Sequence, residues 1–172
     1  HDVKAVEYFI REEMKRFPNL SKYEYLVHYA LTSEDINSLS YAVLLGRARD
    51  IYLKKLDILI KDLKSKSRSW ASLPLLARTH GQAASPSTLG KEFKVFQQRL
   101  LRQKDILKEL KPLAKFGGAT GNFHTLELTD PKINWLNKTN KFLSSFGVEQ
   151  NPITTQIEPV SYTHLRAHET QP

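Results

Sequence analysis

The chain has 172 residues, a formal net charge of +8 and no cysteine. The absence of cysteine excludes disulfides and thiolate-bound metals, and a hydrophobic content of 40% argues against disorder. The sequence contains no apolar run of membrane-spanning length and does not open with a signal peptide. Lysines and arginines alternate with acidic residues, so we interpret the charge mainly as solvated helix faces, with an anionic small substrate as a further expectation.

The N-terminal part of the sequence is predicted to be helical. Residues 1–17 carry apolar side chains at steps of three and four, which is the spacing of one helical face. Asp2 suits the start of this helix, because a carboxylate there complements the unpaired amides. Pro18-Asn19 is expected to end it, and residues 23–31 are expected to form a second, shorter helix.

A much longer helix is predicted to begin at Thr32-Ser33-Glu34-Asp35 and to continue without proline to about Leu73. A hydroxyl of Thr32 or Ser33 can cap this helix, and acidic residues follow in its first turn. The same hydroxyls, next to the free amides of a helix N-terminus, can bind a carboxylate or a phosphate. The motif alone is consistent with a helix cap and with an anion-binding site, and the helix cap is the simpler interpretation.

His80 is predicted to lie in a glycine-containing bend that follows the apolar run 73–77. Ser85 as N-cap and Pro86 as first helical residue predict a second long helix, from 86 to about 111. An imidazole held before a helix can exchange a proton with a ligand near neutral pH. The alternative is a histidine that only satisfies a turn.

The last third of the chain contains loops and one short helix. Residues 116–122 are glycine-rich and predict a tight bend or a backbone surface next to a ligand. They lack the Lys-Ser/Thr ending of a nucleotide-binding loop and follow no predicted strand. Residues 130–147 are expected to form a helix that opens at Asp130-Pro131, stops at Gly147 and turns Leu136, Leu143 and Phe146 inward. Residues 151–159, which include Gln156, are predicted to be extended or loop-like.

Two long amphipathic helices joined by a bent loop predict an all-α fold, a long antiparallel helical bundle. We expect residues 1–31 to end an N-terminal helical region, residues 32–159 to form part of the bundle, and residues 160–172 to be a non-native tail. The sequence shows no internal repeat, no metal-ligand spacing and no serine nucleophile elbow.

Five segments form a combined pattern: His1 to Tyr8, Thr32 to Asn37, Arg78 to Gln82, Gly118 to Asn122 and Asn151 to Pro159. In this order and near this spacing they resemble the bacterial-type adenylosuccinate lyases of the fumarase/aspartase superfamily. The resemblance extends over nearly all of residues 1–159. The glutamine that follows His80-Gly81 and the string Thr154 to Pro159 favour this family over its superfamily relatives.

The resemblance implies a mostly helical enzyme whose central bundle assembles as a homotetramer, with active sites built from three subunits. It implies elimination of fumarate from adenylosuccinate, giving AMP, and from the succinyl-carboxamide imidazole ribotide of purine synthesis. The expected enzyme is cytoplasmic and needs no cofactor and no metal. It is expected to bind a purine nucleotide substrate and to interact with neither nucleic acid nor a membrane.

The resemblance also implies roles for individual residues. His80 matches the family's catalytic histidine, which is expected to protonate the departing nitrogen. Thr32 and Ser33 match residues that hold the succinyl or fumarate portion. The full set of implied substrate-binding positions is His1, Asp2, Thr32, Ser33, Thr79 and Gln156.

The chain departs from the family pattern in three places. The family's second catalytic residue is a serine on a flexible loop beyond the point where the match stops, so the segment alone is expected to be inactive. Residues 160–172 resemble an adapter sequence read as protein, so His164 and His168 are not interpreted as metal ligands. Ala83-Ala84-Ser85 replaces the family's usual Pro-Ala-Thr.

Three alternatives remain open from the sequence. Another lyase of the superfamily, such as an argininosuccinate lyase, shares the Thr-His bend. A non-catalytic helical assembly module keeps the bundle without the chemistry. Nucleic-acid binding through the positive charge is the weakest of the three.

Overall fold

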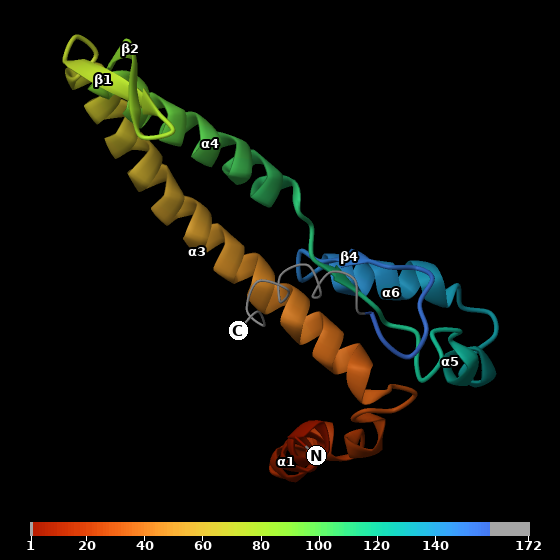
Figure 1. Ribbon diagram of the computed structural model, residues 1–172. Helices are drawn as coiled ribbons and strands as arrows, with labels where there is room; N and C mark the ends of the chain where they lie inside the picture. Colours follow the sequence, from red (N-terminus) through yellow and green to blue (C-terminus); the bar gives the residue numbers. More distant parts are fainter. Residues whose placement is uncertain (1, 159–172) are drawn as a thin grey trace. The chain divides into compact units, whose positions relative to one another are not determined.

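The computed structural model describes residues 2–158 (Figure 1). His1, Pro159 and the proposed tail 160–172 therefore lie outside the described residues. The chain divides into two compact units, one made of residues up to Gly46 together with those from Lys111 onward, the other of Arg47–Leu110. The chain is mostly helical, as predicted, but it also contains short strands that the sequence did not predict.

The first unit begins with helix α1 (Asp2–Lys15), as predicted. Pro18 ends this helix and starts another, α2 (Pro18–Ser21), in which it occupies the first turn. The helix predicted over residues 23–31 is wrong: only the 3-10 turn η1 (Glu24–Leu26) forms there. The reason lies in the backbone, because His28 and Ala30 have φ angles of 65° and 60°, which no right-handed helix accommodates.

The side chain that α1 buries is a charged one. Glu7 is 3% exposed, whereas Val6 and Ile10 of the apolar face are 54% and 41% exposed. Glu7 pairs with Lys4 at 2.8 Å and with Arg11 at 2.9 Å. The hydrogen bond from Lys4 is the main cause that lowers the pKa of Glu7. Much of the apolar face of α1 is thus exposed among the described residues.

The predicted long helix is α3 (Ser33–Ser69), which has 37 residues. Its beginning supplies Ala42 to the core of the first unit, together with Ala114, Leu143 and Val148. Two short strands, β3 (Leu113–Ala114) and β4 (Glu149–Gln150), pair in parallel beside this core. A strand therefore does precede the glycine-rich segment, contrary to expectation.

Two helices connect these strands, α5 (His124–Thr129) and α6 (Trp135–Ser144). The helix predicted over residues 130–147 is shorter, because Asp130 caps the end of α5 and Asn134 caps the start of α6. Leu143 faces inward as predicted, but Leu136 and Phe146 are 43% and 50% exposed. Gly147 follows the helix with a φ angle of 73°, the conformation that stops helices.

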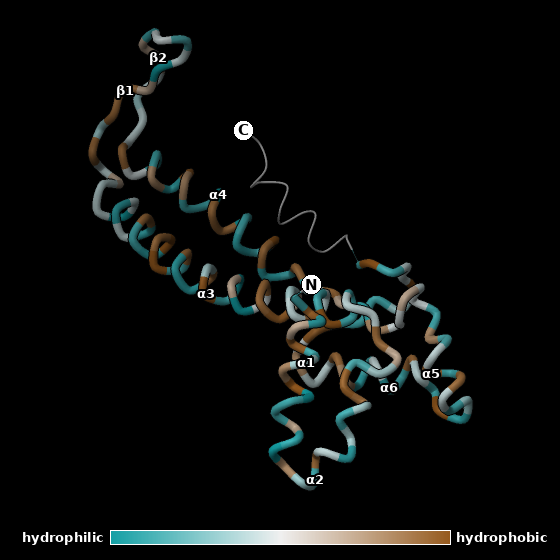
Figure 2. The backbone as a smooth tube through the Cα atoms, turned by 90° about the horizontal axis from the view of Figure 1, so that it is seen from below, coloured by the Kyte–Doolittle hydropathy of each residue, from teal (hydrophilic) through white to brown (hydrophobic). Residues whose placement is uncertain are grey.

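In the second unit, the later part of α3 lies beside helix α4 (Leu89–Glu109). Asp57 pairs with Lys104, and Trp70 meets Phe93 edge to face with ring centroids 4.8 Å apart. Asp57 precedes Trp70 in the chain, whereas its partner Lys104 follows Phe93, the partner of Trp70. The two helices are therefore antiparallel, as predicted. Apolar and polar residues alternate along both helices (Figure 2).

A β-hairpin separates these helices, formed by β1 (Pro74–Thr79) and β2 (Gln82–Thr88). The predicted helix start at Ser85-Pro86 is therefore wrong. Pro86 pairs with Leu76 in the hairpin, and Thr88 is the actual N-cap, accepting a hydrogen bond from the Lys91 amide at 3.2 Å. Among the described residues no helix is both long and apolar enough to cross a membrane.

Candidate active site

The Thr32-Ser33 pair lies where α3 begins, in the first unit. The Thr32 amide donates to the Asp35 carboxylate at 2.9 Å, which is one half of a capping box. Thr32 is half-buried and Ser33 exposed. Within residues 2–158 neither hydroxyl has a hydrogen-bond partner, so both are available at the N-terminus of this helix.

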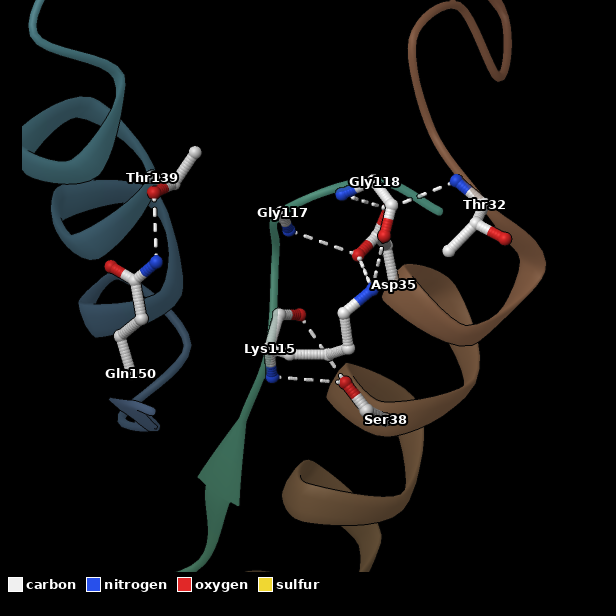
Figure 3. A network of polar contacts seen from close by, with 8 residues as sticks. All are labelled: Thr32, Asp35, Ser38, Lys115, Gly117, Gly118, Thr139 and Gln150. Carbon is white, nitrogen blue, oxygen red and sulfur yellow. Dashed lines mark hydrogen bonds and ion pairs between the residues drawn. The ribbon is translucent and has the colours of Figure 1, made fainter. Parts of the chain in front are cut away.

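The glycine loop, residues 116–122, lies against the start of α3 (Figure 3). The amides of Gly117 and Gly118 both donate to Asp35, each at 3.1 Å. Gly121, with a φ angle of 79°, approaches Thr154 so closely that an added Cβ would overlap the Thr154 carbonyl. The loop therefore makes close contacts with α3 on one side and with residues 151–158 on the other.

Gln156 lies in the segment 151–158 and is exposed. The segment is closed by a hydrogen bond from the Asn151 side chain to the Glu158 carboxylate at 3.0 Å. The contacts through the glycine loop bring this segment and the Thr32-Ser33 pair to the same region of the first unit. Two segments that the sequence singled out thus meet at Asp35, and the third lies against the glycine loop.

Glu34, the residue that follows the hydroxyl pair, has an unusual charge environment. Burial raises its pKa, and the neighbouring Asp35 and Glu158 carboxylates raise it further, while Lys115 acts in the opposite direction. A carboxyl group that holds its proton to higher pH places less negative charge beside the α3 N-terminus.

Asp2 is the first residue of α1, where its carboxylate accepts from the Val3 amide at 2.9 Å. It is exposed, and His1 lies outside the described residues. Helix α1 is linked to the segment before α3 by a hydrogen bond from Arg11 to the Val27 carbonyl, at 3.3 Å. Asp2 thus belongs to the same unit as Thr32 and Ser33.

His80 and Thr79 belong to the second unit, at the tip of the β1-β2 hairpin. Thr79 pairs with Gln82, which leaves His80 and Gly81 as the two turn residues, with φ angles of 53° and 77°. Two positive φ angles define the type I′ turn that joins tight hairpins. The imidazole is exposed at this tip, so the predicted bend is confirmed, with strand β2 between it and the following helix.

Positive φ angles in residues other than glycine cluster near the predicted site segments. His28 and Ala30 precede the hydroxyl pair, Phe123 follows the glycine loop, and the fourth such residue in the described chain is His80. Each costs about 1–2 kcal/mol, and strain of this kind persists where the surrounding structure fixes the backbone for function.

The motifs of the sequence do not include Lys115, whose ammonium group is buried and 2.6 Å from the Asp35 carboxylate. The available signal was a lysine inside an otherwise apolar stretch, Leu113 to Phe116, because lysine is almost never fully buried unless it is paired. The sequence pattern indicated Asp35 only as an acidic residue in the first turn of the helix.

A surface pocket of about 320 Å³ contains none of the predicted site residues and is lined by Leu136, Asn137, Asn140, Glu149, Gln150 and Pro152. The Gln150 side chain donates to the Thr139 hydroxyl at 2.9 Å, as Figure 3 shows. Within residues 2–158 no group of three or more His, Asp or Glu side chains is placed to hold a metal ion.

Several curated proteins similar to this chain are named adenylosuccinate lyase. The chain is 44% identical over 163 residues to the adenylosuccinate lyase of Haemophilus influenzae and 43% identical to that of Escherichia coli K12. Each match covers 94% of this chain and 36% of the relative, so the chain spans about a third of their length. The adenylosuccinate lyase of Legionella pneumophila is 37% identical over 160 residues.

A solved structure gives the same fold. The 3-carboxy-cis,cis-muconate lactonizing enzyme from Pseudomonas putida matches 86% of this chain and 32% of its own, with a TM-score of 0.70 and 26% sequence identity. A sequence profile of the lyase family matches residues 1–166. Because that match extends over nearly the whole chain, the chain belongs to this lyase family.

Proposed function

We propose that this chain is a segment of an adenylosuccinate lyase. The complete enzyme eliminates fumarate from adenylosuccinate, giving AMP, and from the succinyl-carboxamide imidazole ribotide of purine synthesis. The observation that carries the proposal is 43–44% identity, over 94% of the chain, to proteins named adenylosuccinate lyase. The 26% identity to the muconate lactonizing enzyme is lower, which favours elimination over lactonisation.

The reaction breaks one C–N bond and one C–H bond and forms the C=C bond of fumarate. A base removes the proton from the carbon next to a carboxylate, and the electron pair of the C–H bond becomes the new double bond. The electron pair of the C–N bond leaves with the nitrogen, which gains a proton from an acid. Negative charge accumulates on the neighbouring carboxylate before the nitrogen departs, so donors aimed at that carboxylate lower the barrier.

Thr32 and Ser33 supply such donors in this proposal. Their hydroxyls have no partner within residues 2–158. They lie beside the N-terminal amides of a 37-residue helix, an arrangement that favours an anion. We assign them to the succinyl carboxylate, where they hold the substrate and stabilise the charge that accumulates during proton removal.

His80 is the proposed general acid. An amine is a poor leaving group unless it is protonated, and imidazole has a pKa near the working pH. The hairpin tip supports this role because it exposes the ring on a turn of fixed backbone conformation. Thr79, His1, Asp2 and Gln156 are proposed as further substrate contacts, and the abstracting base lies on the family's serine loop, outside this segment.

The proposed enzyme is a cytoplasmic homotetramer with sites shared between subunits. Its substrate is a purine nucleotide, and it uses neither a cofactor nor a metal. His80 belongs to one compact unit of the chain, while Thr32 and Ser33 belong to the other. We propose that the tetramer brings these residues together from different copies, so the isolated segment is inactive.

The test is fumarate release by the complete protein that contains this segment. Adenylosuccinate and argininosuccinate are offered in parallel, and we expect turnover of adenylosuccinate alone. Turnover of argininosuccinate alone would replace the proposal by its superfamily alternative. A tetramer that binds neither AMP nor fumarate in calorimetry would instead indicate a non-catalytic assembly module.

A further inference from the structure

One buried carboxylate joins the start of α3 to the glycine loop. Its Oδ1 atom accepts from the Lys115 ammonium at 2.6 Å and from the Gly117 amide at 3.1 Å. Its Oδ2 atom accepts from the Thr32 amide at 2.9 Å and from the Gly118 amide at 3.1 Å. This residue, Asp35, therefore holds two backbone segments that lie more than eighty positions apart in the sequence.

Lys115 completes the connection. Its ammonium group donates to Asp35 and also to the Gly118 carbonyl at 2.7 Å. Its backbone amide donates to the Ser38 hydroxyl at 3.1 Å, and that hydroxyl donates to the Lys115 carbonyl at 3.3 Å. Both charged side chains are 0% exposed. The glycine loop is thereby fixed in one position along the first two turns of α3 (Figure 3).

Stability alone is a weak reason for such a pair. Burying two charges costs solvation, and an apolar pair of similar volume often stabilises a protein as well or better. An apolar pair cannot hold backbone amides, however. Only an acceptor at position 35 can fix the amide of Thr32 and the amides of Gly117 and Gly118 at the same time.

We propose that Asp35 and Lys115 are positioning residues for the carboxylate-binding hydroxyls of Thr32 and Ser33. This inference rests on the proposed lyase function. The donors must meet the position where charge accumulates on the substrate carboxylate. A misplacement of about 1 Å at a reacting centre can cost roughly 10²-fold in rate. Asp35 and Lys115 set that placement without touching the substrate.

The test uses Lys115→Met and the double variant Asp35→Asn with Lys115→Met, in the complete protein. The double variant leaves no unpaired buried charge, so we expect it to fold, with a moderately lower melting temperature because a backbone amide loses its acceptor. We expect its kcat for adenylosuccinate to fall roughly 10²-fold, with a smaller change in KM, because the donors act mainly in the transition state. The matched control is Lys104→Met, which breaks the ion pair with Asp57 in the other unit and should leave kcat unchanged.

Amide hydrogen exchange gives a readout independent of activity. Asparagine presents an NH₂ group on one side, so either Gly117 or both Thr32 and Gly118 lose an acceptor and should exchange faster. Should the double variant not fold, Ser38→Ala serves as a milder one, with a smaller loss of kcat expected.

The outcomes separate the two proposals. A complete wild-type protein without fumarate-releasing activity refutes the proposed function, and the exchange rates then still test the positioning of the loop. An active wild-type enzyme whose folded double variant keeps wild-type kcat overturns the present inference. Unchanged exchange at all three amides overturns it as well.

Discussion

His80 and Gly81 are the two turn residues of the β1-β2 hairpin, and both have positive φ angles. Glycine adopts this conformation without cost, and histidine tolerates it better than most other residues do. A side chain at position 80 must therefore suit both the turn and the proposed acid chemistry. A change of His80 to asparagine keeps the turn and removes only the acid, because asparagine favours this turn but cannot act as an acid near neutral pH.

We predict that His80→Asn in the complete protein lowers kcat by about 10²–10⁴-fold, the usual contribution of a general acid. Its thermal unfolding should not change, because the hairpin turn is preserved. Gly81→Ala is the matched control: it keeps the imidazole but strains the turn by about 1 kcal/mol or more. Full turnover by His80→Asn would remove the acid role from this residue.

Glu34 provides a prediction about pH. Burial raises its pKa above 4.5 in the folded protein, so the folded state binds the proton more tightly than the unfolded state does. Its contribution to stability therefore falls as pH rises from the unfolded pKa through the folded pKa, and is least favourable at neutral pH. Glu34→Gln should raise the melting temperature at pH 7 and have little effect below pH 4.

The check is a series of thermal unfolding curves between pH 4 and pH 8. Asp105→Asn, an exposed substitution on α4, serves as control and should show no comparable rise at pH 7. A Glu34→Gln protein less stable than wild type at pH 7 would mean that the ionised carboxylate is stabilising, contrary to the pKa direction given by its burial.

At the residue scale, the sequence could identify the polar groups at Thr32, Ser33 and His80 from local patterns. It could not identify the partner of Asp35. A capping motif is visible within four consecutive residues, whereas Lys115 is eighty positions away, and only the folded chain brings the two charges together. Burial of a charged pair depends on packing between distant segments, which no local pattern encodes.

At the scale of elements, the contact between α3 and α4 depends on a glycine. A Cβ at Gly90 would lie 2.7 Å from the Cα of Ala71 and would overlap the Ser67 carbonyl. The same test at Gly46, inside α3, finds only a side-chain contact at 3.7 Å with Pro112. An added methyl group would therefore clash with backbone at Gly90 but not at Gly46, although both glycines lie in helices.

We predict that Gly90→Ala destabilises the protein by about 1–3 kcal/mol, because backbone must move to admit the methyl group. Gly46→Ala should instead stabilise it by about 0.5–1 kcal/mol, the usual gain for alanine over glycine within a helix. Thermal or chemical unfolding of both variants of the complete protein measures the difference. Equal effects of the two substitutions would contradict the close approach at Gly90.

The elements predicted best from sequence are those with long helical periodicity, α3 and α4. The start of α4 was placed three residues too early, because Ser85-Pro86 is a good local helix start. Pairing of Pro86 with Leu76 across the hairpin outweighs that local preference. The strand residues 82–88 contain no apolar alternation, so the sequence predicted a bend at His80-Gly81 but no hairpin.

At the scale of the whole molecule, two compact units carry different parts of the proposed site. The Thr32-Ser33 pair, the glycine loop and Gln156 belong to the unit that contains both ends of the chain, and His80 to the unit of residues 47–110. The sequence could predict these segments as a set, because together they resemble one family. It could not predict how folding divides them, because the division depends on which distant segments pack together.

In the proposed enzyme, each active site takes its acid and its carboxylate-binding hydroxyls from different copies of the chain. The direct measurement is subunit complementation with two inactive variants of the complete protein, His80→Ala and Ser33→Ala. After mixing and reassembly, some sites combine an intact His80 from one copy with an intact Ser33 from another.

A mixture of Thr32→Val with Ser33→Ala is the control. Both changes lie in one segment, so every site of a mixed tetramer contains one of them. We predict that fumarate release returns in the mixture of His80→Ala with Ser33→Ala and stays absent in the control. If native mass spectrometry shows mixed tetramers and neither mixture regains activity, the proposal that active sites are shared between copies is contradicted.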